Sequence, residues 1–171
     1  MKKIVVTLCM TLITVFTVNA QEGLKGGAYI GIPSGNATDY FGLNYGVNVS
    51  YLYPVFENVR LGAMVGVDLF SGKNIPGTNT KFRGASYLPV GLSGQFDLSS
   101  RFFAALDAGV EFSLNKDYKG GYFYQPKGGW QDEFYQVYVY LKRTSTNMDK
   151  APKYSDFSGL TSFGLGVAYK F

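Results

Sequence analysis

The eleven residues LNYGVNVSYLY, Leu43 to Tyr53, decide the fold class. Their odd-numbered positions carry Leu, Tyr, Val, Val, Tyr and Tyr, and four of the five even-numbered positions carry Asn, Gly, Asn and Ser. Because successive side chains of a β-strand point to opposite faces, this alternation predicts a strand with one apolar face. Eleven residues match the roughly 9–11 with which a tilted strand crosses a membrane.

The same alternation recurs along the chain. It is clear in residues 59–70, 88–96, 102–114 and 163–171, and weaker in the glycine-rich residues 24–32. The connections alternate in length, since 54–58 and 97–101 are short, whereas 33–42 and 71–81 are long and polar. Short turns on one side and long loops on the other are typical of outer-membrane barrels with both termini in the periplasm.

An even strand number requires two more strands between residues 115 and 157. We assign these to residues 119–126 and 133–142, with 127–132 as the turn between them and 143–156 as the last outer loop. The aromatic segment 116–130 is either a surface that binds sugar or protein, or a strand with its membrane girdle. The sequence therefore predicts an all-β fold, an antiparallel up-and-down transmembrane β-barrel of eight strands.

The N-terminus predicts export. Lys2 and Lys3 precede an apolar run from Ile4 to Val18, and small residues lead to Ala20. This run is shorter than the roughly 20 apolar residues of a membrane-spanning helix, so we expect a cleaved signal peptide at residues 1–20 and a barrel domain at 21–171. The single cysteine, Cys9, lies in the signal, so the mature chain forms no disulfide.

The polar face separates a membrane barrel from a soluble, lipocalin-like one. A water-facing exterior needs Lys and Glu, but here that face carries mainly Gly, Ser, Asn and Ala. Small residues suit the crowded interior of an eight-stranded barrel. Tyr and Phe also gather near both predicted strand ends, as in the aromatic belts of membrane proteins. We therefore expect the apolar face to contact lipid in the outer membrane.

The C-terminal residues GLGVAYKF, 164–171, carry a resemblance to a known group. The mature chain is similar to the small outer-membrane β-barrel families that include OmpX, the OmpA barrel and the PorT-like "porin family" proteins. Gly166, Tyr169 and Phe171 stand where these families carry the signal read by the barrel-assembly machinery, although Gly164 replaces a usual polar residue. The resemblance implies a monomer whose partners are outer-membrane lipid, periplasmic chaperones, the assembly machinery and an envelope protein.

The residue inventory argues against an enzyme. The chain has no histidine, which excludes histidine-based triads and the usual zinc sites. The enzymatic outer-membrane barrels, among them the lipid A palmitoyltransferase and deacylase, the phospholipase and the omptin proteases, each rely on a histidine. We therefore expect no catalytic, cofactor-binding or metal residues. The formal charge of +4 includes Lys2 and Lys3, and no basic stripe suggests nucleic-acid binding.

Four charged residues fall on the predicted lumen face: Arg60, Asp68, Asp107 and Glu111. Asp107 and Glu111 are either an acid/base pair or part of an interior ion network, and we favour the network. Buried carboxylates need a cationic partner, for which Arg60 and Lys142 are candidates.

These features favour a non-enzymatic barrel that contributes to envelope integrity or surface interaction through its outer loops. One alternative is a narrow channel for small or apolar solutes, with room left by lumenal glycines such as Gly62, Gly66, Gly91 and Gly109. Another, implied by the PorT-like resemblance, is an accessory component of a secretion or assembly complex.

Overall fold

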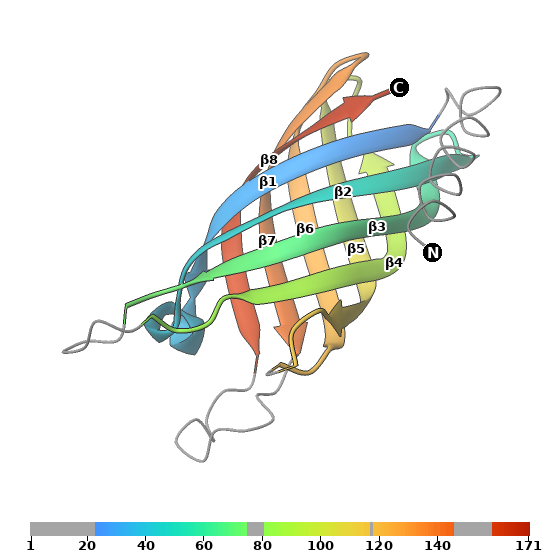
Figure 1. Ribbon diagram of the computed structural model, residues 1–171. Coiled ribbons are helices and arrows are strands. Elements are labelled where there is room, and N and C mark those ends of the chain that lie inside the picture. Colours follow the sequence, from blue (N-terminus) through green and yellow to red (C-terminus); the bar gives the residue numbers. More distant parts are fainter. Residues whose placement is uncertain (1–22, 75–80, 117, 146–158) are drawn as a thin grey trace, which may run out of the picture.

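The computed structural model describes residues 23–74, 81–116, 118–145 and 159–171, and over these residues eight antiparallel strands form one closed barrel (Figure 1). The predicted signal peptide lies outside the described residues. A short 3-10 helix, η1, spans Gly35–Asp39. The strands are β1 Leu24–Ser34, β2 Phe41–Phe56, β3 Val59–Gly72, β4 Ala85–Asp97, β5 Phe102–Ser113, β6 Gly121–Gln131, β7 Tyr135–Ser145 and β8 Leu160–Lys170.

Each strand pairs with its neighbours in sequence, and β1 closes the barrel on β8. In the closing ladder Tyr29 lies opposite Gly166 and Ile30 opposite Leu165. Closure pairs every strand on both sides and leaves no exposed sheet edge. The prediction of an up-and-down antiparallel barrel with eight strands is confirmed.

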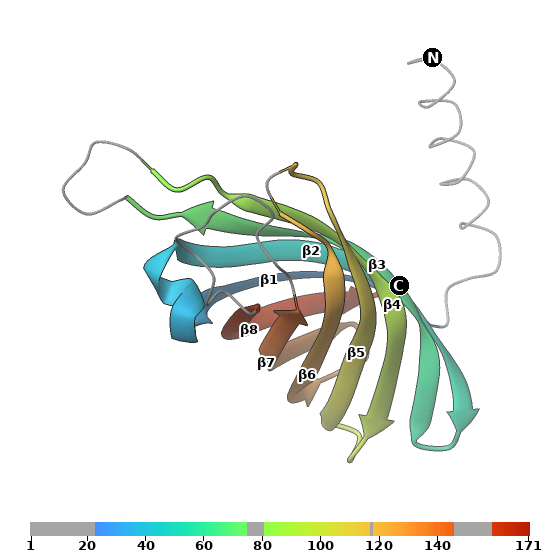
Figure 2. The same ribbon diagram turned by 90° about the horizontal axis from the view of Figure 1, so that it is seen from below.

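The two ends of the barrel differ, as Figures 1 and 2 show. One end, here the terminus end, holds Leu24, Lys170 and the short β2–β3, β4–β5 and β6–β7 turns at residues 57–58, 98–101 and 132–134. The opposite end, here the loop end, holds η1 and the longer connections, among them the one between β3 and β4. This is the predicted alternation of short turns and long loops.

The predicted partition of the sixth strand is wrong. We expected a strand at 119–126 and a turn at 127–132, but β6 continues to Gln131 and the turn is only residues 132–134. Pro126, Gly128 and Gly129 resemble turn residues locally, yet the ladder with β5 runs unbroken through all three. Position 129 has a packing reason to be glycine, because a Cβ there would overlap the Val137 carbonyl of β7.

The seventh strand is longer than predicted. The expected strand 133–142 is found as Tyr135–Ser145, so residues 143–145 belong to β7 and not to the last outer loop. The rest of that predicted loop, residues 146–156, lies outside the described residues. Tyr122, Tyr124 and Trp130 are exposed on the outer face of β6, which agrees with the strand-and-girdle interpretation of segment 116–130.

The two faces of the barrel wall follow the predicted alternation. On β2, Val47 is 56% exposed and its neighbour Asn48 is 8% exposed. On β7, Val137, Val139 and Leu141 point outward, while the side chains between them are buried in the lumen. The apolar face is therefore the exterior of the barrel, and the polar face fills its interior.

Candidate functional site

The charged residues of the strands lie almost entirely on the lumen face. Within the described strands, nine of ten charged residues face inward, and only Arg143, near the loop end of β7, faces outward. The nine are Lys25, Arg60, Asp68, Asp97, Asp107, Glu111, Lys127, Lys142 and Lys170. An outer wall with a single charged residue, Arg143, and a charged interior invert the arrangement of a soluble protein and suit a barrel surrounded by lipid.

Lys142 of β7 is the centre of one buried ion cluster. Its Nζ lies 2.7 Å from Asp68 Oδ2 on β3 and 2.5 Å from Glu111 Oε1 on β5. All three side chains are buried, with exposures of 1% or less. Three strands that are distant in sequence are thus tied across the lumen by one ammonium group. The cluster requires this pairing, because an isolated buried charge is strongly unfavourable.

Neutral side chains complete the Lys142 cluster. Asn44 Nδ2 donates to Asp68 Oδ1 at 2.5 Å, and the hydroxyls of Tyr140 and Ser162 donate to Asn44 Oδ1 at 3.0 and 3.1 Å. The Lys142 ammonium also lies 5.8 Å from the ring centroid of Tyr29 and 5.0 Å from that of Phe123. Both distances fall within the range of cation–π attraction.

Asp107 belongs to a separate pair nearer the terminus end. Lys127 Nζ lies 2.6 Å from Asp107 Oδ2, and the Ser93 hydroxyl donates to Asp107 Oδ1 at 2.5 Å. Asp107 and Glu111 are four residues apart on β5, which separates their Cα atoms by roughly 13 Å. Each carboxylate is held by a different lysine. The structure therefore does not bring the two together as an acid/base pair.

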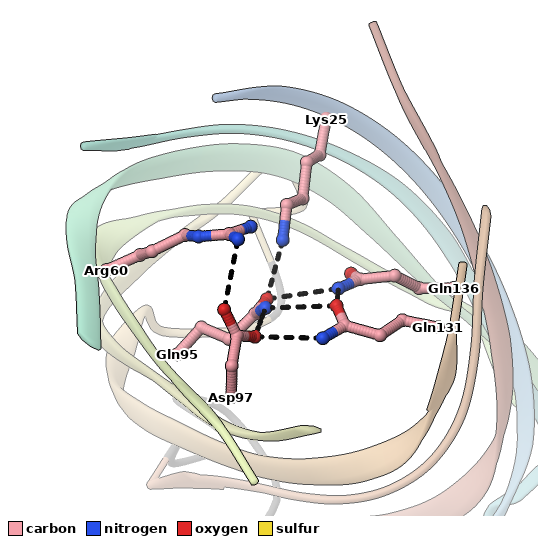
Figure 3. A network of polar contacts seen from close by, with 6 residues as sticks. All are labelled: Lys25, Arg60, Gln95, Asp97, Gln131 and Gln136. Carbon is pink, nitrogen blue, oxygen red and sulfur yellow. Dashed lines mark hydrogen bonds and ion pairs between the residues drawn. The ribbon is translucent and has the colours of Figure 1, made fainter. Parts of the chain in front are cut away.

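Arg60 takes part in a third network, at the terminus end (Figure 3). Its Nη2 lies 3.0 Å from Asp97 Oδ2, and it makes no ion pair with Asp68, Asp107 or Glu111 within the described residues. Gln95 and Gln131 both donate to Asp97 Oδ1, at 2.5 and 3.0 Å. Asp97 is thereby fixed from three sides.

Lys25 and Gln136 extend this terminus-end network across the barrel. Lys25 Nζ donates to Gln95 Oε1 at 2.5 Å, and Gln136 Nε2 donates to the same oxygen at 3.1 Å. Gln136 Nε2 also lies 3.0 Å from Gln131 Oε1. The sequence alone did not identify this group. Asp97 and Gln131 fell in predicted turns, whereas Lys25, Gln95 and Gln136 stand at inward positions of predicted strands.

Aromatic and apolar side chains close the loop end. Phe41, Phe70, Tyr87 and Leu160 are each 3% exposed or less and form a cluster with Ala37, Ala85 and Tyr118. The Phe41 ring lies 5.7 Å from the Phe70 ring and 6.0 Å from the Tyr118 ring, between centroids. Tyr118 also donates its hydroxyl to the carbonyl of Arg83 at 2.6 Å. Among the described residues, this cluster covers the lumen on the loop side.

Solved structures of the same architecture place this geometry in a known fold. The chain matches a structure from "De novo design of transmembrane beta-barrels" with a TM-score of 0.53 and 15% identity, over 87% of this chain and 95% of that one. It matches Ail, the attachment invasion locus protein of Yersinia pestis, with a TM-score of 0.50 and 12% identity, over 88% of this chain and 99% of that one. The fold is that of a transmembrane β-barrel. No protein-family model and no curated protein sequence matches the chain.

Over the described residues, side chains fill the middle of this transmembrane barrel. Between the Tyr138 ring and the terminus-end network lies a cavity of about 20 Å³, lined by Lys25, Asn48, Gln95 and Lys127 among others. A cavity of that size has room for about one water molecule. Within the described residues, no group of three or more metal-ligating side chains is found.

The lumenal glycines do not leave the room that the alternative of a narrow channel needs. A Cβ at Gly62 would overlap the Tyr51 carbonyl, and a Cβ at Gly91 would overlap the Ala108 carbonyl. At Gly66 it would lie 2.6 Å from the Val47 carbonyl oxygen, and at Gly109 it would overlap the Val90 carbonyl. These glycines therefore mark close approaches of neighbouring backbones, and they do not open a passage.

Gly166 faces the lumen beneath the ring of Tyr138. A Cβ at this position would overlap that ring, and Tyr138 supplies all three of its nearest atoms. Gly166 thus has a packing reason to be glycine, whether or not the assembly machinery reads it. The other two residues of the predicted C-terminal signal, Tyr169 and Phe171, lie on the outside with their ring centroids 5.0 Å apart.

Gly166→Ala is expected to lower the free energy of unfolding by about 1–3 kcal/mol, because it overpacks the lumen against Tyr138. Urea titration of the protein in lipid vesicles measures this. In a protein that already carries Tyr138→Ala, Gly166→Ala should be nearly neutral, which is the signature of a direct contact. Gly128→Ala is the matched control, since the nearest atom to its Cβ is the Phe103 carbonyl oxygen at 3.4 Å. Equal losses at both glycines would refute this account of Gly166.

Proposed function

We propose that this protein is an integral outer-membrane β-barrel, without enzymatic activity, that contributes to envelope integrity or surface interaction through its outer loops. One observation carries the proposal: within the described residues, ion-paired and hydrogen-bonded side chains from facing strands cross the lumen at three levels. The Lys142 cluster, the Lys127–Asp107 pair and the terminus-end network occupy successive levels of the lumen. A filled interior leaves the outer surface and the loops as the parts available to other molecules.

The proposed orientation places the terminus end in the periplasm and the loop end outside the cell. The short turns at one end and long connections at the other support it, since bacterial barrels keep their short turns periplasmic. Tyr135, Tyr169 and Phe171 support it as well, because they form an exposed aromatic group at the terminus end, where a membrane girdle belongs.

The likeness to Ail favours surface interaction among the roles of such a barrel. The name of that protein refers to attachment and invasion, and its barrel is matched over 88% of this chain. Loops are the variable, function-bearing parts of a rigid scaffold. We therefore propose that contact with another surface occurs at the loop end of this barrel.

Replacing residues 75–80 and 146–158 by short Gly-Ser linkers tests this role. The variant should still fractionate with the outer membrane and fold, because the strands and their ladders are untouched. Its adhesion to host cells or surfaces, or its resistance to envelope stress, should fall to the level of a gene deletion. The outcome that overturns the proposal is a deletion and a loop replacement that both leave adhesion and stress resistance unchanged.

A further inference from the structure

A polar pocket of about 330 Å³ opens at the terminus end, apart from the loops of the proposed function. Its polar lining includes Asn58, Arg60, Asp97, Ser99, Ser100 and Lys170. These residues come from β3, β4, β8 and the β2–β3 and β4–β5 turns, so barrel closure brings them together. Arg60, Asp97 and Gln131 belong both to the lining of this pocket and to the network drawn in Figure 3.

The pocket holds more hydrogen-bond donors than the protein uses. Arg60 has five N–H donors and engages Asp97 through one guanidinium nitrogen. Among the described residues, the ammonium of Lys170 and the side chains of Asn58 and Ser100 have no hydrogen-bond or ion-pair partner. Ser99 Oγ accepts from the backbone amides of Arg101 and Phe102, which leaves its own hydrogen free to donate.

The carboxylate of Asp97 is already occupied. Oδ1 accepts from Gln95 and Gln131, and Oδ2 accepts from Arg60. Asp97 therefore serves to orient the guanidinium. The net charge of the wall is positive, since Arg60 and Lys170 line it and Asp97 is the only carboxylate in the lining.

Two more carboxylates lie near Lys170 but do not line the pocket. Asp132 and Glu133 are within electrostatic range of the Lys170 ammonium. Asp132 Oδ1 accepts from the backbone amides of Phe134 and Tyr135, at 2.8 and 2.6 Å, and so belongs to the β6–β7 turn. They reduce the positive potential at the rim without supplying an acceptor inside the pocket.

Aromatic side chains at this end of the barrel indicate the level of the pocket relative to the membrane. Phe96, Phe102, Tyr169 and Phe171 are exposed on the outer wall at this end of the barrel. Such aromatic residues lie at the level of the lipid headgroups. The free donors of the pocket therefore open at the level where membrane phosphates are found.

We propose that this pocket binds a phosphate group, with Arg60 and Lys170 as its cationic ligands and Ser99, Ser100 and Asn58 as neutral donors. Arginine presents paired N–H groups that match two phosphate oxygens, and Asp97 holds the guanidinium in place for this contact. The phosphate belongs either to a phospholipid headgroup or to a free anion at the membrane surface. The inference extends beyond the proposed function and does not depend on the loops.

The test uses the mature protein refolded in octyl glucoside, a detergent without phosphate. Titration with inorganic phosphate, followed by NMR of the backbone amides of Ser99, Ser100 and Lys170, should give saturable shifts. Lys170→Gln should weaken binding about tenfold, the loss of one charge-assisted hydrogen bond. Lys170 makes no side-chain bond within the described residues, so this variant should fold. Arg60→Lys, which retains a cation for Asp97, should also weaken binding because it loses the paired N–H groups.

Lys116→Gln is the matched control, because Lys116 is exposed at the loop end. Binding unchanged in this variant supports the site, whereas an equal loss at Lys116 and Lys170 shows unspecific charge attraction and overturns it. Absence of any saturable shift in the unmodified protein overturns it as well. Dihexanoyl-phosphatidylglycerol distinguishes the two phosphate sources: binding tighter than that of inorganic phosphate indicates a lipid headgroup, and equal binding indicates a free anion.

Discussion

Lys142→Met should lower the free energy of unfolding by about 3–5 kcal/mol, because it leaves two buried carboxylates without their common cation. The Lys142 ammonium lies within 2.7 Å of both Asp68 and Glu111, and none of the three side chains reaches solvent. The methionine keeps much of the volume, so the loss reports on charge pairing. Urea titration of the protein folded into phospholipid vesicles measures it, with the fluorescence of Trp130 as the signal.

Two variants control for other causes of that loss. Arg143→Met removes a cation from the next residue, which points outward, and should change stability by less than about 0.5 kcal/mol. The triple variant Lys142→Met, Asp68→Asn, Glu111→Gln removes all three charges and should recover most of the stability. If Lys142→Met costs no more than Arg143→Met, the interior ion cluster does not stabilise the barrel.

Leu165→Arg should lower the free energy of unfolding in a bilayer by about 2–4 kcal/mol, the cost of a charge on the lipid face at the membrane midplane. Leu165 lies at the middle of β8, faces outward and is 59% exposed. The same substitution at Leu114, just beyond the loop end of β5 and 58% exposed, should cost only about 0–1 kcal/mol. Urea titrations in the same vesicles compare them. Similar costs at both leucines would mean that the outer wall does not contact lipid.

The two faces of the barrel could be predicted from sequence residue by residue. On β2 the inward Asn44, Gly46 and Asn48 and the outward Tyr45 and Val47 follow directly from the period of two. Such a pattern needs no knowledge of neighbouring strands, because each strand carries its own inside and outside. The same reasoning failed at β6, where Pro126 and Gly128 are local turn signals that barrel closure overrides.

The side-chain pairings could not be predicted in the same way. Arg60 and Asp68 lie eight residues apart on β3, too far to pair. Whether Arg60 meets Asp97 on β4 depends on how far neighbouring strands are shifted against each other, and that shift is a property of the closed barrel. Asp68 instead meets Lys142, 74 residues away in the sequence. The glutamines of the terminus-end network carry no charge that would mark them as partners of Asp97, and Gln131 fell in a predicted turn.

The lumen of this barrel is expected to be blocked to ions, and single-channel recording tests this most directly. The mature chain is refolded from denaturant and inserted into a planar bilayer, with insertion verified on the same preparation by its resistance to protease. The Lys142 cluster, the terminus-end network and a residual cavity of about 20 Å³ predict insertion without discrete current steps. Reproducible steps of uniform conductance would contradict the account and make a narrow channel the function to pursue.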